Sequence, residues 1–232
     1  MKIGGLQKLT LLDYPGKVAC TVFTVGCNFR CPFCHNGGMV LGVECENVAE
    51  NDLLDFLRKR QKVLEGMCLT GGEPLIQPDI EDFLHKVKQL GYSIKLDTNG
   101  SNPHKLQHLV EQHLVDYVAM DVKNSEDQYA KTAGANVDLA AIRQSVEFLK
   151  TNPCDYEFRT TVTGNYHTEK SIDEMGKWLL GAKRLYLQKF VASEHLLDHT
   201  TYGCDDKTLV RYRLILQQYV DEVHLRGVDV DE

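Results

Sequence analysis

Three cysteines, Cys27, Cys31 and Cys34, lie within eight residues of the stretch CNFRCPFCHN. Thiolates are preferred ligands of zinc and of iron–sulfur clusters. A closed metal site usually takes four protein ligands, so three thiolates leave one position open. An open position is where a substrate or cofactor binds. The stretch therefore predicts either a metal centre with a position open to a substrate or cofactor, as in an enzyme, or a structural zinc site with His35 as its fourth ligand.

Polar residues also follow three apolar segments further along the chain. The sequence TGGEP lies at 70–74, DTNG at 97–100 and DVK at 121–123. In a parallel α/β barrel, catalytic groups lie on the loops at the C-terminal ends of strands, so we expect these segments to share one face with the cysteines. Gly71 and Gly72 would let the backbone approach a ligand closely. An ordinary turn and polar strand caps are the alternatives.

Two more polar residues interrupt apolar segments in the second half of the chain. Arg159 lies within YEFRTTV and Gln188 within RLYLQKFV. If they point inward they join the predicted site, and if they alternate outward they are ordinary surface residues. The sequence leaves both possibilities open.

Apolar, β-branched segments alternate with helical patterns throughout the chain. Asn47 and Glu50 are spaced as a capping pair at a helix N-terminus, and Gly91 predicts the end of the next helix. Asn102 followed by Pro103 predicts the start of a third helix. The predicted strands span 17–25, 67–70, 92–98, 115–122, 156–162, 184–191 and 222–227, and the predicted helices about 47–60, 79–90, 102–113, 138–150, 171–180 and 205–219. Such alternation implies right-handed parallel βαβ units. Six units and a terminal strand predict an α/β partial barrel, with a doubly wound sheet as the alternative.

The composition is that of a soluble globular protein, with 232 residues, 43% hydrophobic and 25% charged. A net charge of −7 without a basic run argues against a nucleic-acid partner. The N-terminal segment has no apolar signal core and no apolar run is long enough for a membrane, so we expect a cytoplasmic protein with reduced thiols. Cys20 and Cys68 lie in apolar runs and are predicted to pack in the core.

The spacing C-x3-C-x2-C, followed after one helix by GGEP, resembles the radical S-adenosylmethionine enzymes. The resemblance covers nearly the whole chain, because the motifs recur in order at the expected strand ends. It implies one radical SAM domain over 1–232 with a partial (β/α)6 TIM-like barrel. It also implies a 4Fe-4S cluster held by Cys27, Cys31 and Cys34, whose fourth iron is chelated by the amino and carboxylate groups of S-adenosylmethionine.

The same resemblance implies which other residues contact the cofactor. Phe33 matches the position beside the adenine, and the GGEP turn matches the segment that binds the amino group of methionine. The full set implied by the resemblance, with the two strand residues that would join it, is Phe33, Gly71, Gly72, Glu73, Asp97, Thr98, Asn99, Asp121, Lys123, Arg159 and Gln188. In the pyruvate formate-lyase activase group the matching aspartates and threonine also bind a monovalent cation, for which hard oxygen ligands are suited.

The segments LLDYPGK and CNFRCPFCHN closely resemble the activating proteins of anaerobic ribonucleoside-triphosphate reductase, within the glycyl-radical enzyme activases. No second set of cysteines follows Cys34, unlike in the larger activases. The resemblance implies an electron from a flavodoxin-like or ferredoxin-like donor, reductive cleavage of S-adenosylmethionine, and a radical stored on a glycine of the partner.

Two other functions stay open: a radical SAM enzyme acting on a small molecule, such as a 7-deazapurine synthase, and a non-catalytic iron–sulfur or zinc module. Segments 124–138 and 193–206 are predicted to be long loops at the rim of the site.

Overall fold

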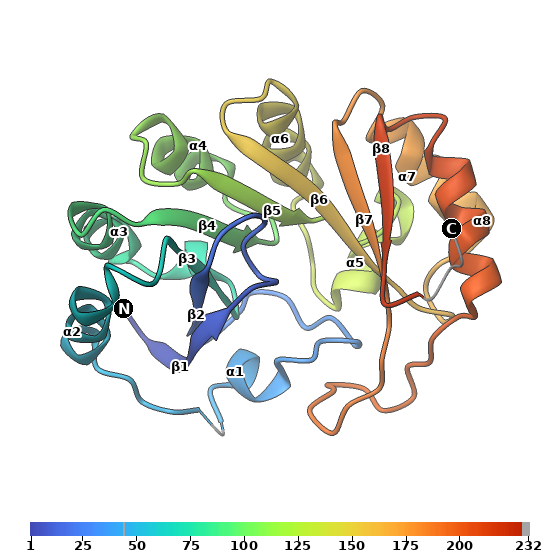
Figure 1. Ribbon diagram of the computed structural model, residues 1–232. Helices are drawn as coiled ribbons and strands as arrows, with labels where there is room; N and C mark the ends of the chain where they lie inside the picture. The colour runs from blue at the N-terminus through green and yellow to red at the C-terminus, as the bar shows by residue number, and fades with distance from the viewer. Residues whose placement is uncertain (44, 229–232) are drawn as a thin grey trace.

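The computed structural model describes residues 1–43 and 45–228, which contain one curved eight-stranded sheet in the order β1 to β8 (Figure 1). β1 pairs antiparallel with β2, and every later pair of neighbours is parallel. The strands are β1 (Ile3–Thr10), β2 (Ala19–Thr24), β3 (Gly66–Gly71), β4 (Ser93–Thr98), β5 (Tyr117–Asp121), β6 (Asp155–Val162), β7 (Arg184–Lys189) and β8 (Glu222–Arg226).

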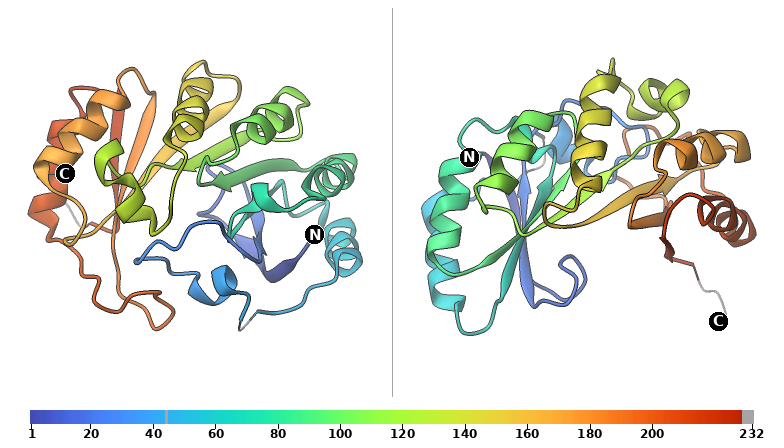
Figure 2. Two further views of the ribbon diagram at one scale, coloured as in Figure 1. Left: turned by 180° about the vertical axis from the view of Figure 1, so that it is seen from behind. Right: turned by 90° about the horizontal axis from the view of Figure 1, so that it is seen from above.

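Most helices lie along the convex side of this sheet, as Figures 1 and 2 show for α2, α3, α4, α6, α7 and α8. The helices are α1 (Gly37–Leu41), α2 (Glu50–Arg60), α3 (Ile80–Gln89), α4 (Pro103–Glu111), α5 (Glu126–Ala133), α6 (Leu139–Lys150), α7 (Glu169–Trp178) and α8 (Asp206–Leu216), with the 3-10 turn η1 (Pro74–Ile76). A doubly wound sheet would carry helices on both faces. The arrangement is instead an open α/β barrel, which confirms the predicted fold class.

The main hydrophobic core lies between the sheet and the helices. Side chains alternate along each strand, so Val118 and Met120 of β5 join this core, whereas Tyr117 and Ala119 belong to a small cluster with Tyr14 on the concave face. The remaining concave face carries polar and charged side chains near the C-terminal ends of the strands. The alternation therefore separates a stabilising face from a face free for chemistry.

The seven predicted strands and six predicted helices are all present, and four further elements, β1, α1, α5 and the 3-10 turn η1, were missed. β1 covers the segment before the first predicted strand, where two adjacent glycines, Gly4 and Gly5, obscure the alternation. α1 has only five residues. The segment 124–138, predicted as a loop, contains the eight-residue helix α5, so that prediction was wrong. Both helices are too short for a helical period to stand out in the sequence.

The predicted helix ends are mostly confirmed. Asn102 Oδ1 accepts a hydrogen bond from Lys105 N at 3.2 Å, and Gly91 has a left-handed φ of 85° just after α3. The predicted capping pair at α2 is wrong, because the helix begins at Glu50 and no side chain caps it. The reason is a bridge in which Val48 N donates to Ile3 O at 3.1 Å and keeps the preceding backbone extended.

Both Cys20 and Cys68 are fully buried, but only Cys20 packs in the hydrophobic core as predicted. Cys68 points to the opposite face of the sheet, where its Sγ lies 3.7 Å from Asp97 Oδ1. Within residues 1–43 and 45–228, no helix combines the length and apolarity needed to cross a membrane.

Candidate functional site

The C-terminal ends of β2 to β6 surround one cavity on the concave side of the sheet. The cavity is lined by all three predicted cluster ligands and by every other predicted site residue except Gln188, namely Phe33, Gly71, Gly72, Glu73, Asp97, Thr98, Asn99, Asp121, Lys123 and Arg159. Gln188 instead lines a neighbouring cavity with Leu12 and Arg226. Asp97 and Arg159 border both cavities, so their ion pair forms part of the wall between them.

The cysteine loop is fixed by backbone contacts with two distant segments. Arg30 N donates to Ala133 O at 2.9 Å, which attaches the loop to the end of α5. Asp198 N donates to Pro32 O at 3.0 Å, so the predicted rim segment 193–206 covers the other side of the loop. These contacts hold the loop that carries the thiols.

The three thiols have the chemistry of metal ligands held in a partly dry cavity. Burial raises the pKa of Cys27 and Cys34, and raises the pKa of Cys31 to about 11. The thiols therefore stay protonated near neutral pH until a metal displaces the protons. In an iron–sulfur cluster, different iron atoms are bound by different cysteine thiolates. Three separate thiols around one cavity therefore fit such a cluster.

His35 lines the same cavity as the three thiols, but the geometry does not favour a single zinc ion there. No three His, Cys, Asp or Glu side chains in the part of the chain that the structure describes converge closely enough to hold one metal ion. His35 is exposed, and its ring lies 5.7 Å from the ring of Phe190. A single zinc ion would need His35 and the three thiols within bonding distance of one point.

The glycine turn after β3 packs directly against the backbone that leads into Cys27. Gly71 has a left-handed φ of 105°, and a Cβ on Gly72 would lie 1.9 Å from Gly26 O. Gly72 N donates to Thr24 O and Glu73 N donates to Gly26 O, each at 2.8 Å. The two glycines are thus needed for the close approach of two loops that both line the cavity.

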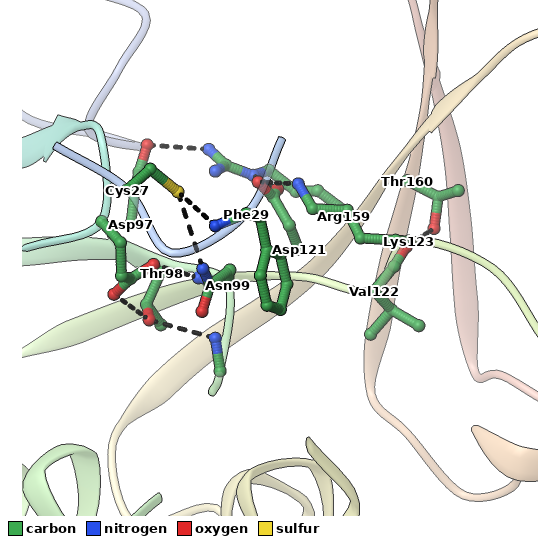
Figure 3. Close-up of polar contacts among 12 residues, drawn as sticks. Cys27, Phe29, Asp97, Thr98, Asn99, Asp121, Val122, Lys123, Arg159 and Thr160 are labelled. Atoms are coloured by element: carbon green, nitrogen blue, oxygen red, sulfur yellow. Dashed lines mark hydrogen bonds and ion pairs between the residues drawn. The ribbon is translucent and has the colours of Figure 1, made fainter. Parts of the chain in front are cut away.

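The Glu73 carboxylate joins the glycine turn to the end of β4. It accepts hydrogen bonds from Thr98 Oγ1 and Asn99 N, each at 2.7 Å, and from Leu75 N at 3.0 Å. Burial raises its pKa to about 7, although the three hydrogen bonds favour the ionised form. Asn99 in turn reaches Cys27, with Nδ2 3.9 Å from Sγ (Figure 3). Glu73 therefore orders residues that line the cavity.

Asp97 and Asp121 are bridged by one guanidinium group (Figure 3). Arg159 Nη1 donates to Asp97 Oδ2 at 2.9 Å and Nε donates to Asp121 Oδ1 at 3.0 Å. Lys123 and Lys95 add further ion pairs, to Asp121 and Asp97 respectively. Burial disfavours both carboxylates, but these cations outweigh it and hold the pKa of each below its usual value. Arg159 thus points inward, and its outward alternative is wrong.

Lys95 was not predicted as a site residue, although its position carried a usable signal. In SIKLDT, Lys95 and Asp97 are two residues apart, so a strand places them on the same face. Asn36 was missed as well, and its Nδ2 donates to Gly71 O at 3.1 Å and supports the glycine turn. Asn36 lies in an irregular stretch, where no periodicity reveals such a contact.

Comparison with known proteins agrees with this geometry. The Radical SAM superfamily matches residues 21–179. A Methanocaldococcus jannaschii protein that bears the name of a glycyl-radical enzyme activating enzyme is 31% identical over 197 residues, which are 81% of this chain and 79% of that protein. A 7-carboxy-7-deazaguanine synthase of Methanopyrus kandleri is 27% identical over 198 residues, 75% of this chain and 73% of that enzyme.

Among solved structures, a radical SAM methyltransferase from Sphaerobacter thermophilus superposes with a TM-score of 0.69 at 16% identity. The superposition covers 96% of this chain and 70% of that one, and at this identity it indicates a shared fold alone.

Proposed function

The chain belongs to the radical SAM superfamily, and from that premise we propose that Cys27, Cys31 and Cys34 hold the family's 4Fe-4S cluster in an activase of a glycyl-radical enzyme. The observation that carries the proposal is the single cavity lined by the three thiols, the glycine turn and the charged ends of β4, β5 and β6. When bound, the cluster supplies an electron for reductive cleavage of S-adenosylmethionine, which yields methionine and a 5'-deoxyadenosyl radical.

In this proposal, different residues around the cavity bind different groups of S-adenosylmethionine. We assign the methionine amino group to the backbone of Gly71 and Gly72, where no side chain intervenes. The methionine carboxylate is attracted by Lys123 and Arg159, whose charges are fixed by their carboxylate partners. Phe33 is buried beside the thiols and offers an aromatic face to the adenine. Glu73 and Asn99 keep these groups aligned.

The proposed substrate is a glycine in a partner protein, with anaerobic ribonucleoside-triphosphate reductase as the leading candidate. A hydrogen atom would pass from the glycine Cα to the 5' carbon of the nucleoside, which leaves the unpaired electron on the glycine. LLDYPGK and the compact cysteine motif favour this reductase over partners of the larger activases. A flavodoxin-like or ferredoxin-like protein would provide the electron.

A second candidate is a radical SAM enzyme acting on a small molecule of the 7-deazapurine type. The similarity to the Methanopyrus kandleri synthase over three quarters of this chain supports it. The two candidates differ in whether the hydrogen donor is a protein or a small molecule.

Electron paramagnetic resonance distinguishes these functions. Reconstituted protein would be reduced anaerobically and mixed with S-adenosylmethionine and the reductase from the same organism, with Cys31→Ala protein as the control. A glycyl-radical doublet supports the activase. The doublet should be absent when Cys31→Ala protein replaces the natural protein, and absent when the radical-bearing glycine of the reductase is replaced by alanine. Release of 5'-deoxyadenosine without any doublet contradicts this partner and favours the second candidate.

A further inference from the structure

The resemblance to pyruvate formate-lyase activases implies a monovalent cation at Asp97 and Asp121, yet the oxygens of both carboxylates are already engaged. Asp97 Oδ2 accepts from Arg159 Nη1 at 2.9 Å, and Asp97 Oδ1 accepts from Lys95 Nζ and, more weakly, from Cys68 Sγ at 3.7 Å. Asp121 Oδ1 accepts from Arg159 Nε and Asp121 Oδ2 from Lys123 Nζ, each at 3.0 Å. Each of the four oxygens therefore has a cationic partner supplied by the protein.

The hydroxyl of Thr98, the third ligand implied by the resemblance, is also committed. It donates to Glu73 Oε1 at 2.7 Å and accepts from Gly100 N at 3.1 Å. A monovalent cation needs several oxygens whose lone pairs are free to face it. The donor set at this position consequently does not fit such an ion.

The charge balance leads to the same result. The side chains that pair directly with the two aspartates are three cations, Lys95, Lys123 and Arg159. Nearby Glu157 is balanced by its ion pair with Arg226, and burial raises the pKa of Glu73 to about 7. The side chains of Lys95, Asp97 and Arg159 are only 3%, 12% and 14% exposed, so water screens them weakly. A further cation would add a like charge in this poorly screened region, which is unfavourable.

We propose that Lys95 and Arg159 occupy the place of the monovalent cation and hold Asp97 and Asp121 in position, so that this chain binds S-adenosylmethionine without an added alkali cation. Lys95 lines the neighbouring cavity rather than that of the cysteines, and it acts through Asp97. It is therefore a positioning residue. This inference depends on membership of the superfamily and not on the identity of the partner protein.

The test measures S-adenosylmethionine affinity of the cluster-loaded protein in potassium, sodium or choline chloride at equal ionic strength. We expect the natural protein to bind equally well, within about twofold, in all three salts. Lys95→Met should lose roughly tenfold in affinity in choline chloride, because a hydrogen bond to a charged group is removed. Potassium or sodium should restore most of that loss by binding at the freed Asp97 oxygen.

Lys105→Met is the matched control, because Lys105 Nζ also makes an internal hydrogen bond, to Gln77 O at 2.9 Å, but is not paired with Asp97 or Asp121. It should show no response to the cation. Lys95→Gln keeps a hydrogen-bond donor toward Asp97 but removes the positive charge. It replaces Lys95→Met in the same salt comparison if Lys95→Met does not fold.

The same salts can be compared by thermal unfolding of the cluster-free proteins, a measurement independent of catalysis. Potassium should stabilise the Lys95 variants and leave the natural protein unchanged. A natural protein whose cofactor affinity rises tenfold with potassium or sodium would overturn the proposal. Folded Lys95 variants that respond to cations no more than the natural protein would also overturn it.

Discussion

Replacing Gly72 with alanine should separate the two loops that line the cofactor cavity. The added Cβ would lie 1.9 Å from Gly26 O, whereas ordinary contact begins near 3.4 Å, so the backbones must part by about 1.5 Å (3.4 − 1.9). That movement would break two hydrogen bonds of 2.8 Å, from Gly72 N to Thr24 O and from Glu73 N to Gly26 O.

The cost of this substitution can be estimated from its parts. Two backbone hydrogen bonds contribute about 1 kcal/mol each, and overpacking costs roughly 1–3 kcal/mol, so the free energy of unfolding should fall by roughly 3–5 kcal/mol. The cluster should still assemble, because the cysteine loop keeps its backbone hydrogen bonds with Ala133 and Asp198. Affinity for S-adenosylmethionine should fall at least about tenfold, since its binding depends on the displaced turn.

Urea unfolding of the cluster-free protein and anaerobic titration with S-adenosylmethionine measure the two effects. Gly91→Ala is the matched control, because Gly91 has a φ of 85° but an added Cβ there would meet no atom within 4 Å. It should cost about 1–2 kcal/mol of backbone strain and leave cofactor affinity unchanged. If Gly72→Ala behaves like Gly91→Ala in both assays, the close approach of the two loops has no role in cofactor binding.

Three further predictions concern the cluster and its surroundings. Cys31→Ala should lose iron and nucleoside release together, whereas Cys154→Ala, at a half-buried thiol outside the cysteine cavity, should keep both. Equal iron loss in the two variants would refute the ligand assignment. Burial raises the Glu73 pKa from 4.5 to about 7, so folding favours the neutral carboxyl group and the free energy of unfolding falls as pH rises through this window. Glu73→Gln should remove roughly 3 kcal/mol of this pH dependence between pH 4.5 and 7. Identical urea-unfolding profiles of the two proteins across this range would contradict the prediction. Asn99→Ala removes a donor to Cys27 and should lower the cluster potential in a redox titration; an unchanged or higher potential would count against that hydrogen bond.

The sequence was sufficient to predict most of the site because parallel strands end at one common edge. Cys27, Gly72, Asp97 and Asp121 follow or end successive strands, so their order along the chain already implied that they meet. The side to which Arg159 points could not be derived, since alternation along a strand leaves two choices until its partners are known. Only the sheet register, which sets Arg159 beside Asp121, decides it.

Gln188 shows where such reasoning fails. It lies in a strand of the correct type and pairs with Thr161, which lines the cysteine cavity, yet Gln188 itself borders the neighbouring cavity with Arg226. The antiparallel β1 was missed for a related reason: strand pairing between distant segments supplies the stability that its glycine-containing sequence lacks.

The measurement that tests the account most directly follows a hydrogen atom. The reductase would be prepared with glycine deuterated at both Cα positions and incubated with the reduced, reconstituted protein and S-adenosylmethionine. The account predicts that the released 5'-deoxyadenosine gains one deuterium as the glycyl radical appears. Nucleoside released without deuterium, while the partner glycine keeps its full label, would contradict it.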